Sequence, residues 1–121
     1  MASTQKQMDK DQSQNDDQQM SAFIETMQVL RSLDSEFPIQ HALALGIISQ
    51  NPGMSLTQLA EKLNLNLSTV SRIIGALSDH RANGHPYYMV EVKKSEQERR
   101  RKELYLTPKG EAFLKKVEGC F

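Results

Sequence analysis

The sequence predicts a mainly α-helical (α+β) domain that carries one β-hairpin near its C-terminal end. Apolar residues recur at helical spacing up to about residue 77, which indicates amphipathic helices. The period then changes, because two segments within residues 87–106 are rich in aromatic, β-branched and alternating apolar residues, as strands are. A chain of 121 residues makes one domain of this kind.

The N-terminal segment is polar. Residues 1–19 consist largely of Gln, Asp, Ser and Lys, and Met1 and Met8 are almost their only apolar side chains. Such a segment cannot bury enough apolar surface to offset the entropy that is lost on ordering. We therefore expect a disordered polar tail at residues 1–19 and a folded domain at residues 20–121.

Two helices are expected in the first half of the domain. The first runs from about Ser21 to Leu33 and has one apolar stripe, made of Met20, Phe23, Ile24, Met27, Leu30 and Leu33. The second starts at Pro38, because proline is tolerated at the first helical position. Its residues Ile39–Ser49 are apolar on most sides. We expect a central buried helix that ends at Asn51-Pro52-Gly53.

The most informative segment is Leu56–Leu77, which reads as a helix, a tight turn and a second helix. The apolar faces have the same spacing in both helices, and they consist of Leu56, Leu59, Ala60 and Leu63 and then of Val70, Ile73, Ile74 and Leu77. Ser55 and Gln58 form a capping-box pattern at the start of the first of these two helices. Asn66 or Ser68 can cap the second helix.

The other face of the second helix is free of acidic residues. It carries small or polar side chains and one arginine, namely Ser68, Thr69, Ser71, Arg72, Gly75 and Ala76. A helix in a DNA major groove needs small residues for close approach and donors for phosphates and base edges. This face therefore points to DNA recognition.

Charge is distributed unevenly along a chain whose net charge is zero. Residues 1–20 and 21–80 each carry a net charge of −2, and residues 81–121 carry +4. The densest positive run is Arg99-Arg100-Arg101-Lys102. Because phosphates respond to the local field, a neutral protein can still present a basic surface to DNA.

The basic run lies in the expected hairpin. Its strands are Tyr87–Val92 and the segment around Lys102–Leu106, and the polar residues from Lys93 to Arg101 form a long charged tip. Thr107 and Pro108 then cap and start a last helix, whose apolar face consists of Phe113, Leu114 and Val117.

This order of elements is that of a winged helix-turn-helix domain with a two-stranded β-hairpin wing, and the residues resemble the MarR family of transcriptional regulators. The segment LTQLAEKLNLNLSTVSRIIGAL resembles the DNA-reading helix pair of that family. The segment SEQERRRKELYLTPKGEAFL resembles its wing and the Leu-Thr-x-x-Gly start of its C-terminal helix. The resemblance extends over Pro38–Val117, and its wing half is the more specific part.

The resemblance implies a role for each matching residue. Ser68, Thr69, Ser71 and Arg72 would contact base edges and phosphates. The Asp-x-Arg motif of the family falls on Glu98-Arg99-Arg100, with Glu in place of Asp. There the acid would orient the hairpin and the arginine would enter the minor groove. Arg99, Arg100 and Arg101 together are the expected DNA-contacting residues of the wing.

Family members pair through long terminal helices and bind small aromatic effectors where those helices meet the DNA-binding lobe. The C-terminal helix is short here, but the apolar stripe within residues 20–33 is wider than that helix covers. Uncovered stripes of this size tend to find a partner. We expect a homodimer that pairs through Ser21–Leu33 and the C-terminal helix. An effector is possible, and nothing in the sequence supports one.

Other classes of site lack a matching pattern. His41, His80 and His85 are too scattered to suggest a metal site. No phosphate-binding glycine loop or nucleophile motif is present, so we expect neither a cofactor nor an enzyme. The sequence contains no apolar run of membrane-spanning length. Cys120, the single cysteine, fits a cytoplasmic setting.

Two classes of function remain open. The first is a sequence-specific double-stranded DNA-binding transcriptional regulator. The second is a winged helix that serves as a protein-interaction module on a transcription or replication complex, with a wing that is merely solvated. The acid-free helix face favours the first class, and the neutral net charge leaves room for the second.

Overall fold

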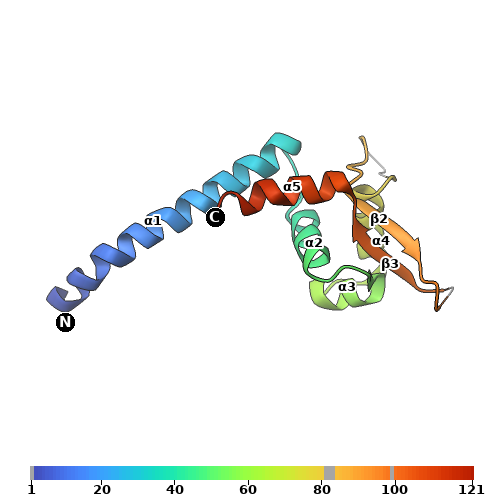
Figure 1. Cartoon of the computed structure of the whole chain (residues 1–121), viewed down its shortest axis with the longest axis horizontal. Coiled ribbons are helices and arrows are strands. Elements are labelled where there is room, and N and C mark those ends of the chain that lie inside the picture. Colours follow the sequence, from blue (N-terminus) through green and yellow to red (C-terminus); the bar gives the residue numbers. More distant parts are fainter. Residues whose placement is uncertain (1, 81–83, 99) are drawn as a thin grey trace.

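The computed structural model describes residues 2–80, 84–98 and 100–121, and for residues 2–15 it describes the backbone alone. The elements of this part of the chain are α1 (Ala2–Leu33), α2 (Ile39–Gln50), β1 (Met54–Ser55), α3 (Leu56–Leu63), α4 (Leu67–Leu77), β2 (Val90–Lys94), β3 (Lys102–Leu106) and α5 (Pro108–Glu118). Helices α2–α4 and the sheet form a lobe, from which α1 extends with α5 beside its C-terminal half (Figure 1). The mainly α fold with a β-hairpin wing is confirmed.

Helix α1 begins much earlier than the sequence predicts. It is continuous from Ala2 to Leu33 and includes the segment for which we expect a disordered tail. Gln, Lys, Met and Ala are good helix formers, and adding turns to an existing helix avoids the cost of nucleation. The helical start at Ser21 is therefore wrong. That residues 1–19 are disordered in solution stays a prediction.

Helix α2 is buried on one side only. Ala44, Leu45 and Ile48 are buried in the core, whereas Ile39 is 80% exposed and Leu43 is 52% exposed. The prediction of a helix buried on most sides is wrong for these two residues, because α3, α4, α5 and β3 contact α2 from the opposite side. Pro38 is the N-cap residue of α2, whereas the sequence predicts that it occupies the first helical position.

Helices α3 and α4 form the predicted pair, and their caps explain where each one starts. The capping box of Ser55 and Gln58 is complete at α3. Asn64 then adopts a left-handed conformation at the C-cap, with φ of 55°, and turns the chain toward α4. The side chain of Asn66 caps α4 by accepting a hydrogen bond from the Thr69 N–H at 2.8 Å.

The sheet has three antiparallel strands in the order β1-β3-β2. The wing consists of β2 and β3, and Val92 lies opposite Leu104. The sequence analysis misses β1, because a two-residue strand between a turn and a helix shows no alternation. Met54 of β1 pairs with Leu104, so β1 joins the wing to the start of α3.

Residues 87–89 are not part of the wing, although the sequence predicts a strand from Tyr87. Their N–H groups bond to the end of α4: Tyr87 to the carbonyl of Ala76 at 3.0 Å, Tyr88 to that of Ser78 at 2.9 Å, and Met89 to that of Leu77 at 2.7 Å. These acceptors are carbonyls that a helix end leaves without intrahelical partners. Because the N–H groups of residues 87–89 bond to these carbonyls, β2 begins only at Val90.

Helix α5 starts against this same segment. Thr107 caps it by accepting a hydrogen bond from the Gly110 N–H at 3.1 Å, and the Thr107 N–H donates to the Met89 carbonyl at 3.0 Å. A Cβ atom at position 110 would overlap that carbonyl oxygen. Glycine at this position therefore lets the first turn of α5 approach the backbone of Met89.

We expect Gly110→Ala to destabilise the fold, because the new methyl group meets a backbone atom that cannot rotate away. Overpacking of this kind lowers the free energy of unfolding by about 1–3 kcal/mol. Gly46→Ala in α2 is the matched control, since no atom lies within 4 Å of its added Cβ. This control raises the free energy of unfolding by up to about 1 kcal/mol, because alanine is the better helix former. Urea denaturation of the two variants measures both effects, and equal stability would contradict the prediction.

Candidate nucleic-acid interface

The N-terminal half of α4 presents the residues that the sequence predicts for DNA contact. Ser68, Ser71 and Arg72 are exposed, and Thr69 is half-buried. The Ser68 hydroxyl donates to the Asn66 side chain at 2.8 Å, so the cap orients one side chain of the exposed face. The sequence analysis assigned Asn66 only a capping role, and the structure gives it this second contact.

The C-terminal half of α4 belongs to the folded core instead. Ala76 is only 7% exposed, so its place on the exposed face is a wrong prediction. Gly75 is half-buried, and a Cβ there would lie 3.0 Å from the backbone oxygen of His80. Small residues at these two positions are explained by packing. The exposed face of α4 is reduced to Ser68, Thr69, Ser71 and Arg72.

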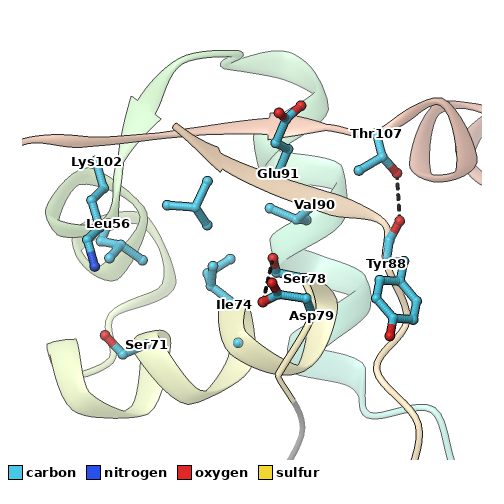
Figure 2. A pocket seen from close by; sticks show the side chains of 12 residues that line it. Leu56, Ser71, Ile74, Ser78, Asp79, Tyr88, Val90, Glu91, Lys102 and Thr107 are labelled. Carbon is cyan, nitrogen blue, oxygen red and sulfur yellow. Dashed lines mark hydrogen bonds between the residues drawn. The ribbon is translucent and has the colours of Figure 1, made fainter. Parts of the chain in front are cut away.

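A groove separates α4 from the wing. It has a volume of about 510 Å³, and Figure 2 shows Leu56, Ile74 and Val90 around its centre. Polar groups of Ser71, Lys102 and Tyr88 lie at its edges (Figure 2). The exposed face of α4 and the wing are therefore two ridges on one side of the lobe, with a partly apolar groove between them.

Ser95 organises the tip of the wing. Its hydroxyl oxygen accepts hydrogen bonds from the N–H groups of Gln97 and Glu98, both at 3.2 Å. Its own N–H donates to the carbonyl of Arg101 at 2.8 Å, and the Arg101 N–H donates to the carbonyl of Glu98 at 3.0 Å. Sequence reasoning missed this residue, although Ser95 and Glu98 stand at the Ser-x-x-Glu spacing that signals a cap.

The two wing arginines that the structure describes do not share one environment. Arg99 lies outside the described residues. Arg100 is exposed at the tip. Arg101 is half-buried, and its Nη2 donates to the Gln58 Oε1 at 3.4 Å. The structure thus leaves Arg100 in contact with solvent and turns Arg101 toward α3.

The outer part of the wing carries charges of both signs. Lys93 lies 3.9 Å from Glu91 and 5.2 Å from the centre of the Tyr105 ring. Partial burial and the neighbouring Glu103 carboxylate raise the pKa of the Tyr105 hydroxyl. The strands are electrostatically mixed, and the arginine run concentrates positive charge near the tip.

A contact between distant segments holds the end of α4 in place. The hydroxyl of Tyr87 donates to the Asp34 carboxylate at 2.6 Å. The Tyr87 ring packs edge-on against Phe37, with ring centres 5.0 Å apart. Asp34 and Phe37 lie between α1 and α2, so this contact connects the corner of these helices to the segment that bonds α4.

Two other features are absent from the part of the chain that the structure describes. It holds no group of three or more His, Cys, Asp or Glu side chains that could bind a metal ion. None of the described helices combines the length and the apolar character that crossing a membrane requires.

The helix pair matches a known sequence family. Residues 44–79 match a family described as winged helix-turn-helix DNA-binding. No curated protein sequence matches the chain. The matched residues comprise most of α2 together with α3 and α4, which are the elements that build the exposed face.

Solved structures show the same fold over most of the chain. RV1404 from Mycobacterium tuberculosis has a TM-score of 0.69 at 18% identity, and the match covers 82% of this chain and 63% of that one. FabT from Streptococcus pneumoniae, solved in complex with DNA, has a TM-score of 0.64 at 22% identity over 93% and 73% of the two chains. The MarR family transcription regulator SP03579 has a TM-score of 0.60 at 22% identity over 98% and 74%.

These matches establish the winged helix-turn-helix fold that MarR-family transcription regulators have. The chain spans less than two-thirds of the length of RV1404, the first of these structures.

Proposed function

We propose that the protein is a sequence-specific, double-stranded DNA-binding transcriptional regulator. The observation that carries this proposal is the exposed, acid-free face of α4 beside a wing with basic residues at its tip. FabT, which has the same fold, was solved in complex with DNA. A cytoplasmic location is part of the proposal.

Each ridge has a different task in this proposal. Helix α4 enters the major groove, where Ser68, Thr69, Ser71 and Arg72 contact base edges and nearby phosphates. The wing lies along the DNA backbone with Arg99, Arg100 and Arg101, of which one enters the adjacent minor groove and the others meet phosphates. The groove between the ridges gives the phosphate backbone room to pass.

We also propose that the regulator acts as a homodimer. Four apolar side chains of α1 stay uncovered by the rest of the described chain, at 57% exposure for Met20, 55% for Phe23, 49% for Ile24 and 40% for Met27. Ala22, on another side of the helix, is buried, and α1 is in contact with α5. Leu30 and Leu33, at the end of the stripe, pack against the core. A second copy of the chain is the proposed partner of the four exposed residues.

A two-fold dimer suits the proposed DNA binding. Two recognition helices related by symmetry read two half-sites about one helical turn apart. The proposed interface consists of Ser21–Leu33 and α5, and residues 1–19 contribute nothing to it. No effector ligand is part of the proposal.

The first test identifies the DNA site by selection from a random pool, followed by binding measurements on the selected site. We expect Arg72→Ala to weaken binding by about 1–3 kcal/mol and to relax the preference at one or two base pairs. Lys62→Ala, which removes an exposed lysine from α3 outside the proposed DNA contacts and the proposed dimer interface, is the control and leaves the preference unchanged. A loss that is equal on all sequences reassigns Arg72 to phosphate, and no loss would contradict recognition by α4.

The second test concerns the wing. Replacing Arg99, Arg100 and Arg101 by alanine should reduce affinity on every sequence, because wing contacts to phosphate carry no sequence information. The slope of log K against log salt falls by roughly 0.9 for each phosphate contact that is lost. Alanine at Lys6 and Lys10, within the segment 1–19 that takes no part in the proposed interface, removes two positive charges elsewhere and serves as the control. Unchanged affinity and slope in the triple variant would show that the run is only solvated.

The third test is sedimentation of the full chain, whose monomer mass is 13.7 kDa. We expect a dimer at tens of micromolar, and we expect Ile24→Glu to dissociate it, because a carboxylate in an apolar interface is costly. Leu67→Glu is the matched control, since Leu67 is 51% exposed on α4, outside the proposed interface. Deleting residues 1–19 should leave the dimer intact. A monomeric wild-type chain would defeat this part of the proposal.

A mobility-shift experiment at two salt concentrations tests the whole proposal. Binding to duplex DNA that weakens with salt supports it. No binding at low salt would overturn it and would favour a protein-interaction module instead.

A further inference from the structure

The side chain of Arg101 turns back from the wing toward the helix pair. Its backbone closes the tip, through a hydrogen bond from its N–H to Glu98 and another from the Ser95 N–H to its carbonyl. Its guanidinium reaches α3, where Nη2 donates to the Gln58 Oε1 at 3.4 Å. Forty-three positions of sequence separate these two residues. One residue thus connects the wing tip to the helix that precedes the recognition helix.

The acceptor of this bond is itself fixed in place. Gln58 Oε1 also accepts a hydrogen bond from the Ser55 N–H at 3.0 Å, and the Gln58 N–H donates to the Ser55 hydroxyl at 3.1 Å. A side chain held in a capping box has lost most of its rotamer freedom before it meets a partner. Gln58 is therefore a rigid anchor for the arginine.

Arg101 also separates two surface hollows of similar size. It lines one of about 520 Å³, together with Gly53 and Glu61, and another of about 500 Å³, together with Thr57 and Leu67. Its Nε atom is buried, and among the described residues no group accepts a hydrogen bond from it. An unsatisfied buried donor costs free energy, so this side chain contributes little to the stability of the fold.

We infer that Arg101 is the positioning residue of the wing: it fixes the angle between the wing and the helix pair by binding Gln58. This inference rests on the proposed DNA binding for its functional consequence and stands on its own as a statement about the wing. It divides the arginine run into Arg100, which is free to contact DNA, and Arg101, which acts mainly through Gln58.

The first experiment measures the mobility of the wing in the absence of DNA. Backbone order parameters of Glu96, Gln97 and Glu98 are obtained by NMR relaxation of the full chain. We expect values near those of rigid backbone, about 0.85, to fall toward 0.6 in Arg101→Ala and in Gln58→Ala. Arg100→Ala is the matched control and leaves these values unchanged. The melting temperature stays nearly constant in Arg101→Ala, which a mainly structural role would not allow.

The second variant at position 58 tests the mechanism. Gln58→Glu preserves the capping box, because Glu is equally suited to that position. Its carboxylate accepts a charge-assisted bond from Arg101, so we expect the order of the wing tip to be retained or increased. Loss of order in this variant, or retention of order in both alanine variants, overturns the inference whether or not the protein binds DNA.

The third experiment is a double-mutant cycle in DNA affinity. If Arg101 acts through Gln58, Gln58→Ala weakens binding by about threefold to tenfold in the wild type and by less than about twofold in the Arg101→Ala background. Ser55→Ala removes the other half of the capping box, leaves the Arg101 contact intact and serves as the control for lost cap stability. Additive losses would overturn the inference and return Arg101 to an independent phosphate contact.

The two proposals fail in different ways. A wild-type chain that does not bind DNA defeats the proposed function, and the order parameters then decide the role of Arg101. A chain that binds DNA with a wing insensitive to Arg101 and Gln58 defeats the positioning role alone.

Discussion

The arrangement of α4 and the wing depends on the backbone of one residue, Met89. Its N–H bonds to the last turn of α4 at 2.7 Å, and its carbonyl accepts from Thr107 at the start of α5 at 3.0 Å. Met89 is fully buried, and it directly precedes β2. The end of α4, the start of the wing and the start of α5 therefore meet at this residue. Gly110 is the residue that makes this meeting sterically possible.

Elements with a local cause could be predicted from the sequence, and elements with a distant cause could not. The helix pair, its capping box and the Thr107 cap follow from side chains within four positions of each other, and all are confirmed. The backbone of residues 87–89 bonds to the end of α4 and not to a strand, which no alternation pattern reveals. The exposure of Ile39 and Leu43 likewise depends on which side of α2 the other elements cover.

The candidate site shows the same division. Helical spacing was sufficient to place Ser68, Ser71 and Arg72 on an exposed face. It placed Ala76 there too, because periodicity does not show how far the neighbouring segment covers a helix. Within the run of arginines, the sequence offers no means of distinguishing the exposed Arg100 from Arg101, whose partner lies in α3. That difference depends on a contact with Gln58, which lies 43 positions away in the sequence.

The hydrogen bond between Tyr87 and Asp34 couples the orientation of α1 to the position of the end of α4. Asp34 follows directly after α1, and Tyr87 begins the segment whose N–H groups hold the end of α4. A rotation of the long arm α1 about this corner must either carry the end of the recognition helix with it or break a short bond to a carboxylate. In the proposed homodimer, the way in which two copies pair along α1 therefore sets the tilt at which α4 is presented, far from where the copies touch.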